Sequence, residues 1–97
     1  MEKTILVIGT FDTKDDELNY IRDCILAQGG QVLTMDVSVL GDPSTPTDIS
    51  KHKVAETGGS SIAAAIASED ENIAMQIMAN GAAALAVELY LAGRIHG

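Results

Sequence analysis

The chain has 97 residues, and its 14 acidic and 6 basic side chains give a formal net charge of −8. A chain of this length forms one domain at most, and its acidic balance excludes a nucleic-acid-binding surface of the usual basic kind. A single cysteine, Cys24, excludes an internal disulfide and a cysteine-ligated zinc site. Apolar residues make up 46% of the sequence, which is typical of a globular protein rather than a disordered one.

No targeting segment is visible in the sequence. The first apolar run, residues 5–8, is too short for the core of a signal peptide. The apolar stretch 73–95 consists largely of alanine and is interrupted by Gln76, Asn80 and Glu88, which makes it a poor lipid-facing helix. We therefore expect a cytoplasmic protein with neither a membrane nor a nucleic acid as partner.

The first third of the sequence has the pattern of a strand, a helix and a second strand. Residues 4–8 form a continuous β-branched run, typical of a strand covered on both faces of a parallel sheet. A helix is predicted over residues 14–28, with Thr13 as its N-cap and two glycines after its end. Its apolar side chains recur at helical spacing: Leu18, Ile21 and Ile25. Residues 31–36 are predicted to be the second strand, which completes a βαβ unit.

A loop and three helices are predicted for the remainder. Residues 37–47 contain both prolines and several hydroxyl side chains, which indicates a loop. Asp48 is expected to cap a short helix over residues 49–56. A second short helix over residues 62–68 and a long one over residues 69–95 follow.

The long predicted helix is apolar around most of its circumference. Its polar side chains Asn72, Gln76, Asn80 and Arg94 form one narrow stripe, and a helix of this kind is normally buried. Parallel sheets normally contain more than two strands and are covered on both faces. We therefore expect either that the chain oligomerises through this helix or that it is the N-terminal piece of a longer protein, and we favour the second.

The turn after the first strand is the main candidate binding site, because open α/β sheets bind ligands at the carboxyl ends of their strands. Backbone donors, two hydroxyls and one ammonium come from Gly9, Thr10, Asp12, Thr13 and Lys14. The turn has neither the G-x-G-x-x-G nor the P-loop pattern. Its acidic neighbours would repel a phosphate unless a Mg²⁺ ion bridged the two. An ordinary helix start with a solvated acidic first turn is the open alternative.

Two further segments have binding potential. Asp36 ends the second strand, where dinucleotide-binding folds place an acid that accepts hydrogen bonds from a ribose, and Ser38 is a weaker companion. Gly58 and Gly59 precede a helix start, and free N–H groups there could form a nest for an anion. A solvated loop aspartate and a plain helix break are the open alternatives. No catalytic constellation and no metal-ligand pattern is identifiable in the sequence.

Several segments resemble one known family along essentially the whole chain. They are I-L-V-I-G-T-F-D-T-K-D-D-E-L (5–18), M-D-V-S-V (35–39), D-I-S (48–50), V-A-x-x-G-G (54–59) and the closing M-A-N-G-A-A-A-L-A-V-E-L-Y-L-A-G-R-I-H-G. They are similar to the tomato mosaic virus resistance protein type, in which the N-terminal part is an ATP-binding domain and many bacterial members are uncharacterised. The resemblance implies two Rossmann-like subdomains with ATP in the cleft. It also implies a partner-binding role, since the plant member binds a viral replication protein.

We therefore expect an α/β fold, a partial Rossmann-like, three-layer parallel sheet. Residues 1–97 would be a single domain or a fragment of the first Rossmann-like subdomain. The expected function is ATP or nucleotide binding, with Mg²⁺ as a further candidate cofactor and a regulatory or partner-binding role. Two alternatives stay open: an oligomerisation module with a vestigial nucleotide site, and a Mg²⁺-dependent enzyme that uses Asp12 or Asp36 on a phosphorylated small molecule. The expected partners are a nucleotide and either a second copy or the rest of a longer chain.

Overall fold

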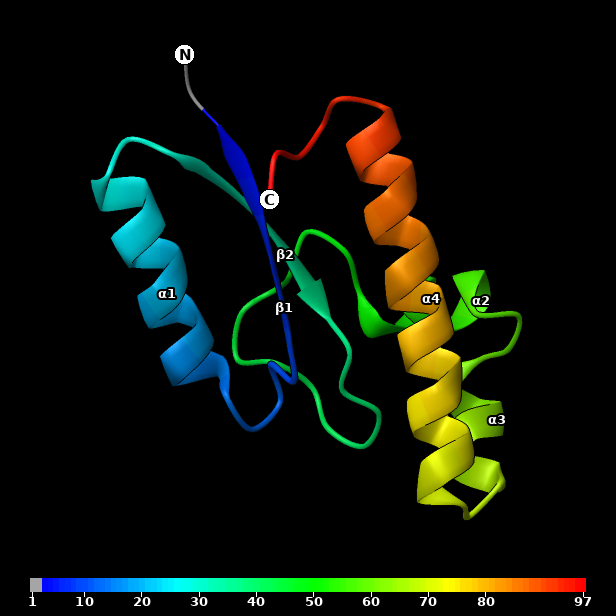
Figure 1. Cartoon of the computed structure of the whole chain (residues 1–97). Helices are drawn as coiled ribbons and strands as arrows, with labels where there is room; N and C mark the ends of the chain where they lie inside the picture. Colours follow the sequence, from blue (N-terminus) through cyan, green and yellow to red (C-terminus); the bar gives the residue numbers. More distant parts are fainter. Residues whose placement is uncertain (1–2) are drawn as a thin grey trace.

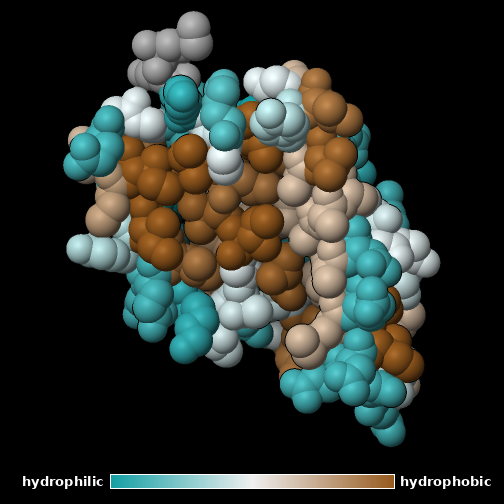
Figure 2. Space-filling model, in the orientation of Figure 1, coloured by the Kyte–Doolittle hydropathy of each residue, from teal (hydrophilic) through white to brown (hydrophobic). Residues whose placement is uncertain are grey.

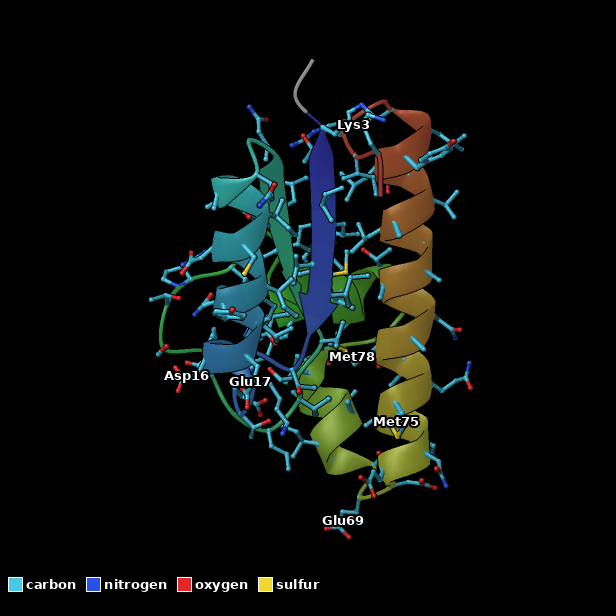
Figure 3. The ribbon with its side chains drawn as sticks, turned by 60° about the vertical axis from the view of Figure 1, so that its left-hand side comes forward. Lys3, Asp16, Glu17, Glu69, Met75 and Met78 are labelled. Atoms are coloured by element: carbon cyan, nitrogen blue, oxygen red, sulfur yellow. The ribbon has the colours of Figure 1, made fainter. Side chains whose placement is uncertain are left out.

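The computed structural model describes residues 3–97 and has the expected α/β fold (Figure 1). The elements follow in the order β1 (Thr4–Gly9), α1 (Asp15–Ala27), β2 (Gln31–Asp36), α2 (Lys51–Thr57), α3 (Ile62–Ala67) and α4 (Glu71–Leu91). They lie in three layers, with α1 on one side of the strands and α4, packed on α2, on the other (Figures 1 and 3). The main core lies between the strands, α2 and α4, and its buried members are Met35, Val54, Ala55, Ile62, Met78 and Leu85.

The sheet contains two parallel strands, β1 and β2, whose six positions pair one to one. The last residues of the chain return to the other edge of β1. The N–H of His96 donates to the carbonyl of Thr4 (2.8 Å), and the N–H of Leu6 donates to the carbonyl of Gly97 (2.7 Å). Residues 96–97 therefore run beside β1 in its own direction, at the position of a third parallel strand.

The start of α1 differs from the prediction. The hydroxyl of Thr13 does not cap this helix, because α1 begins later, behind Lys14, and has no side-chain cap. The carbonyl of Thr10 accepts hydrogen bonds from the N–H groups of Thr13 (3.2 Å) and Lys14 (2.9 Å). A separate turn thus precedes the helix and fixes the path of the loop after β1.

The cap of α2 also differs from the prediction. Asp48 does not cap this helix; its carboxylate accepts hydrogen bonds from the N–H (2.8 Å) and the hydroxyl (3.1 Å) of Thr34 on β2. The hydroxyl of Ser50 caps α2 instead, by accepting from the N–H of Lys53 (3.3 Å). The physical reason is that Asp48 finds its donors on a strand that is distant in sequence, which leaves the cap to the next hydroxyl residue along the chain.

Helix α4 is shorter than predicted at both ends. Asp70 caps its start with a carboxylate that accepts from two N–H groups of the first turn. At the other end, Gly93 has a φ of 74°, and the N–H of Arg94 donates to the carbonyl of Leu89 (2.9 Å). A glycine in this left-handed conformation is a common helix terminator. The early end frees residues 94–97 to return to β1.

Helices α2 and α4 cross at very close range, and glycines make this crossing possible. A Cβ atom on Gly81 of α4 would overlap the carbonyl oxygen of Val54 and lie 2.8 Å from its carbonyl carbon. A Cβ atom on Gly58, just after α2, would likewise overlap the carbonyl oxygen of Ile77. Backbone atoms cannot move aside as a side chain can, so only glycine fits at both positions.

Most of α4 is uncovered in this chain, although its composition is that of a buried helix. Only Met78, Gly81 and Leu85 are buried. The large exposed apolar residues of α4 are Ile73, Met75, Val87, Tyr90 and Leu91. Within residues 3–97, α4 is the one helix long and apolar enough to cross a bilayer, but length and composition alone are weak evidence for that role. Figure 2 shows the same excess of apolar surface, which extends from the strands across to α4.

Candidate functional site

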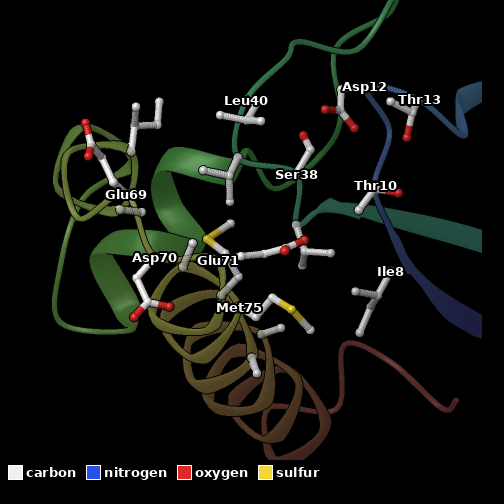
Figure 4. Close-up of a pocket in the computed structure, with 18 residues that line it drawn as sticks. Ile8, Thr10, Asp12, Thr13, Ser38, Leu40, Glu69, Asp70, Glu71 and Met75 are labelled. Atoms are coloured by element: carbon white, nitrogen blue, oxygen red, sulfur yellow. The ribbon is translucent and has the colours of Figure 1, made fainter.

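The carboxyl end of β1 borders a cavity of about 730 Å³ (Figure 4). Its walls come from the end of β1, the loops after β1 and β2, α3 and the first half of α4, and they are mainly apolar. The connection from β1 to β2 passes through α1 on one face of the sheet. The connection from β2 to residues 96–97 passes through α4 on the other face. The cavity therefore lies at the point where the strand order reverses, which is where open α/β sheets bind ligands.

Four of the nine predicted binding residues line this cavity: Thr10, Asp12, Thr13 and Ser38. Figure 4 shows Thr10, Asp12 and Ser38 on the strand side, with Glu69 on the opposite side. The remaining five predicted residues are not part of the lining: Gly9, Lys14, Asp36, Gly58 and Gly59. The structure thus brings together the loop after β1 and the start of the loop after β2.

The polar groups of the loop after β1 are largely unused within the described chain. Asp12 is half-buried, and one of its carboxylate oxygens accepts a hydrogen bond from the N–H of Gly41 (3.2 Å). Its other oxygen and the hydroxyls of Thr10 and Thr13 have no partner among residues 3–97. These three groups of the loop after β1 are available to a ligand.

Asp36 is not part of the cavity lining, which corrects the expectation that it accepts hydrogen bonds from a ribose. It is 1% exposed, and one carboxylate oxygen accepts three hydrogen bonds. The donors are the N–H of Phe11 (3.3 Å) and the N–H (2.9 Å) and hydroxyl (2.6 Å) of Ser38. Asp36 thus ties the loop after β1 to the loop after β2. A buried carboxylate cannot reach a substrate, so Asp36 is not the reacting group of a Mg²⁺-dependent enzyme. Because the Ser38 hydroxyl donates its proton to Asp36, it can only accept from a ligand.

Gly9 and Lys14 lie beside the cavity without contributing to its lining. The carbonyl of Gly9 accepts from the N–H of Val37 (2.9 Å), and a Cβ atom at this position would run into the side chain of Leu18 on α1. Lys14 is exposed at the start of α1. Gly9 therefore serves close packing between β1 and α1, while the ammonium of Lys14 is left in solvent.

The glycine pair after α2 does not form an anion nest, which corrects that expectation. The N–H of Gly58 donates to the carbonyl of Val54 (3.0 Å), and the N–H of Gly59 donates to the carbonyl of Glu56 (3.0 Å). Neither group is free for an anion. Gly58 belongs to the close crossing of α2 and α4, and Gly59 ends the helix with a φ of 85°.

The charged side chains among the described residues that line the cavity are all acidic. They are Asp12, Glu69, Asp70 and Glu71, and none of the described residues that line the cavity is lysine or arginine. A bare anion is disfavoured there, whereas a cation or a phosphate neutralised by Mg²⁺ is not. Within residues 3–97, no group of three or more His, Cys, Asp or Glu side chains could hold a metal ion. A Mg²⁺ ion would therefore take most of its ligands from phosphate and water, as is usual for this ion.

The loop after β2 is held by two side chains, Lys51 and Ser44, whose contacts the sequence reasoning missed. Lys51 is buried, and its ammonium donates to the carbonyl of Gly41 (2.7 Å) and lies 2.9 Å from the carboxylate of Asp42. The hydrogen bond and positive charge of Lys51 lower the pKa of Asp42 below its ordinary value. The hydroxyl of Ser44 donates to Asp15 on α1 and lowers the pKa of that carboxyl. These contacts anchor the loop that carries one wall of the cavity.

Comparison with known proteins assigns the chain to a family. The model for the N-terminal domain of the uncharacterised protein family UPF0261 matches residues 3–97. The chain belongs to this family. It is 48% identical over 93 residues to a UPF0261 protein of Brucella suis and 39% identical over 89 residues to one of Clostridium tetani. These matches cover 96% and 92% of the chain but only 22% of either relative, so the chain spans about a fifth of their length. No solved structure matches the chain.

This membership corrects the resemblance drawn from the sequence. The family model and the relatives from Brucella suis and Clostridium tetani are all UPF0261, and none of them indicates the tomato mosaic virus resistance type. The ATP-binding cleft and the viral partner that this resemblance implied therefore have no support from the family. Any argument for a ligand of the UPF0261 chain has to come from its own cavity.

Proposed function

We propose that this region of a UPF0261 protein binds a Mg²⁺-nucleotide, with ATP as the first candidate, and that it has a regulatory or partner-binding role. One observation carries the proposal. The unpartnered polar groups of Thr10, Asp12 and Thr13 lie together at the carboxyl end of β1, where the strand order reverses beside a large apolar cavity.

The chemistry of the two sides of the cavity supports this ligand class. The hydroxyls of Thr10 and Thr13 can donate to phosphate oxygens, and the free oxygen of Asp12 can accept from a water bound to Mg²⁺. Leu40, in the loop after β2, and Ile66, on α3, line the cavity and offer apolar surface for a base. Residues 3–97 contribute no lysine or arginine to the lining, so Mg²⁺ is the charge we propose to offset the repulsion between the acidic side chains there and the phosphates.

Calorimetric titration tests the proposal. Mg²⁺-ATP is titrated into the 97-residue chain and into the longer Brucella suis relative. We expect binding that requires Mg²⁺, with Asp12→Asn raising the Kd about tenfold, which corresponds to about 1.4 kcal/mol. Asp16→Asn is the matched control, because Asp16 is exposed on α1 outside the cavity, and it should leave the Kd unchanged. Absence of binding heat in both proteins would overturn the proposal.

Self-association is a second candidate function, favoured by the outer face of α4. At 3.6 residues per turn, Ile73, Val87 and Leu91 share one face of this helix, and all three are exposed. This face points away from the buried Met78 and Leu85. Light scattering should then show a dimer that Val87→Glu converts to a monomer without loss of nucleotide binding. A monomer at high micromolar concentration would dismiss this candidate.

A further inference from the structure

The outer edge of β1 is only half paired. Thr4 and Leu6 use this edge to hydrogen-bond with His96 and Gly97. Alternate residues of a strand in a parallel sheet direct their N–H and carbonyl groups to the same side, so Ile8 presents both groups to the same edge. Neither has a hydrogen-bond partner beyond β1 in the part of the chain that the structure describes. An open edge of this kind is a template for another strand.

The part of the cavity beside this edge is apolar and uncovered. The side chain of Ile8 is 43% exposed, although β1 is flanked by neighbours on both edges. Across the cavity from it, Met75 on α4 is 63% exposed. Met78, Ala79 and Ala82 complete this side of the lining. Figure 2 shows the apolar surface continuing from the strands to α4 without a polar break. Apolar surface of this extent is normally covered.

We infer that, in the longer UPF0261 proteins, the polypeptide that follows the position of Gly97 continues along β1 as a third parallel strand. Its inward side chains would fill the part of the cavity between Ile8 and Met75. The family model is that of an N-terminal domain, and the matched region is about a fifth of each relative, so a long continuation follows it there. A strand advances about 3.3 Å per residue, and Gly97 lies level with Ile5, because its carbonyl accepts from the N–H of Leu6. Three residues beyond Gly97 therefore bring the strand level with Ile8.

A tethered strand fits this edge better than a second copy of the chain does. His96 and Gly97 already occupy the first half of the edge. A strand from another molecule could pair only with the groups that remain toward the Ile8 end of this edge. The continuation, in contrast, starts in register and in the right direction. The part of the lining at Leu40 and Ile66 stays open to a ligand, so this inference does not depend on nucleotide binding.

Thiol labelling in a longer protein tests the inference. The test protein is a chimera in which these 97 residues replace the matching N-terminal region of the Brucella suis relative. All cysteines in the part that comes from the relative are substituted. Met75→Cys is compared with Tyr20→Cys, because Tyr20 on α1 has a similar exposure of 70% but lies outside the cavity lining. Exposed Cys24 is the internal reference. Without nucleotide, we expect Met75→Cys to label at least about tenfold more slowly than Tyr20→Cys. Equal labelling rates would overturn the inference.

Hydrogen exchange gives a second readout, measured in the same longer protein without the cysteine substitutions. The amide of Ile8 should be protected by about a hundredfold or more, as in a paired strand, and rapid exchange would overturn the inference. Light scattering identifies the occupant. Protection that appears only in a dimer and is lost on dilution would assign the edge to a second copy, and the inference would be wrong.

Discussion

Replacing Gly81 by alanine should destabilise the protein, although alanine is the better helix former. The new Cβ atom would overlap the carbonyl oxygen of Val54 and lie 2.8 Å from its carbonyl carbon, both in the backbone of α2. Carbon atoms in ordinary contact are about 3.5–4.0 Å apart. Helices α2 and α4 would therefore have to separate by about 1 Å, which loosens the core around Met78 and Leu85.

The expected magnitude is the difference between two opposing effects. Overpacking a core costs about 1–3 kcal/mol, and a clash with backbone belongs at the upper end of that range. Alanine returns about 1 kcal/mol through helix propensity. The net loss is about 2 kcal/mol in the free energy of unfolding. At a urea slope of about 1–3 kcal/mol per molar, the midpoint of unfolding followed by circular dichroism should fall by about 1 M.

A matched control separates packing from propensity. Ala83 is exposed on the same helix, so Ala83→Gly should cost about 1 kcal/mol through propensity alone. Adding a methyl group at position 81 and removing one at position 83 would then both destabilise the protein. A Gly81→Ala variant with an unchanged or higher urea midpoint would refute the close crossing, since that is the result expected of a glycine in open space.

Three further predictions concern carboxylates. Asp36→Ala removes the acceptor of three buried hydrogen bonds and should lower the free energy of urea unfolding by about 2–4 kcal/mol. An unchanged urea midpoint would contradict the role of Asp36 in connecting the two loops. The pKa of Asp42, followed by NMR titration, should lie below its ordinary value and rise toward it in Lys51→Met, which removes the two largest causes of the lowering. Since the folded-state pKa is lowered, this carboxyl stabilises the fold above the ordinary pKa, and the contribution disappears as the pH falls through the folded-state pKa. Asp70→Ala removes the cap of α4 and should cost about 1 kcal/mol, with faster amide exchange confined to the first turn.

The elements that could be predicted from the sequence are those set by local pattern. The β-branched run before Gly9 and the helical spacing of Leu18 and Ile25 specify a strand and a helix, whatever packs against them. The caps were less predictable, because they depend on distant partners. Asp48 is a good capping residue by type, yet its carboxylate bonds to Thr34 on β2. Nothing in the sequence near Asp48 indicates that strand.

The residues of the candidate site also fall into two groups: those whose position local sequence predicts and those whose position depends on the fold. Thr10, Asp12 and Thr13 follow a strand directly, so their position at its carboxyl end could be predicted from the sequence. The burial of Asp36 could not, because its donors come from two loops that only the folded chain brings together. Lys51 did leave a signal: it lies three residues before Val54 and therefore on the buried face of the helix.

Gly81 also left a signal in the sequence. A glycine inside an otherwise strong helical pattern usually has a packing reason. Here the reason is the carbonyl group of Val54, which leaves no room for a side chain on the facing helix. The sequence could therefore have indicated a close helix crossing, but it could not have indicated which helix lies opposite.

The acidic lining of the cavity restricts how a phosphate could be held there. Two like charges 4 Å apart repel by about 4 kcal/mol at an effective dielectric constant of about 20, and the lining has acids but no described lysine or arginine. The neutralising charge must then come from Mg²⁺ or from basic side chains of the polypeptide that follows in the longer proteins. Titration of the longer protein with ATP in the presence of EDTA distinguishes the two. Binding without Mg²⁺ would assign the charge to the polypeptide, and binding only with Mg²⁺ would assign it to the ion.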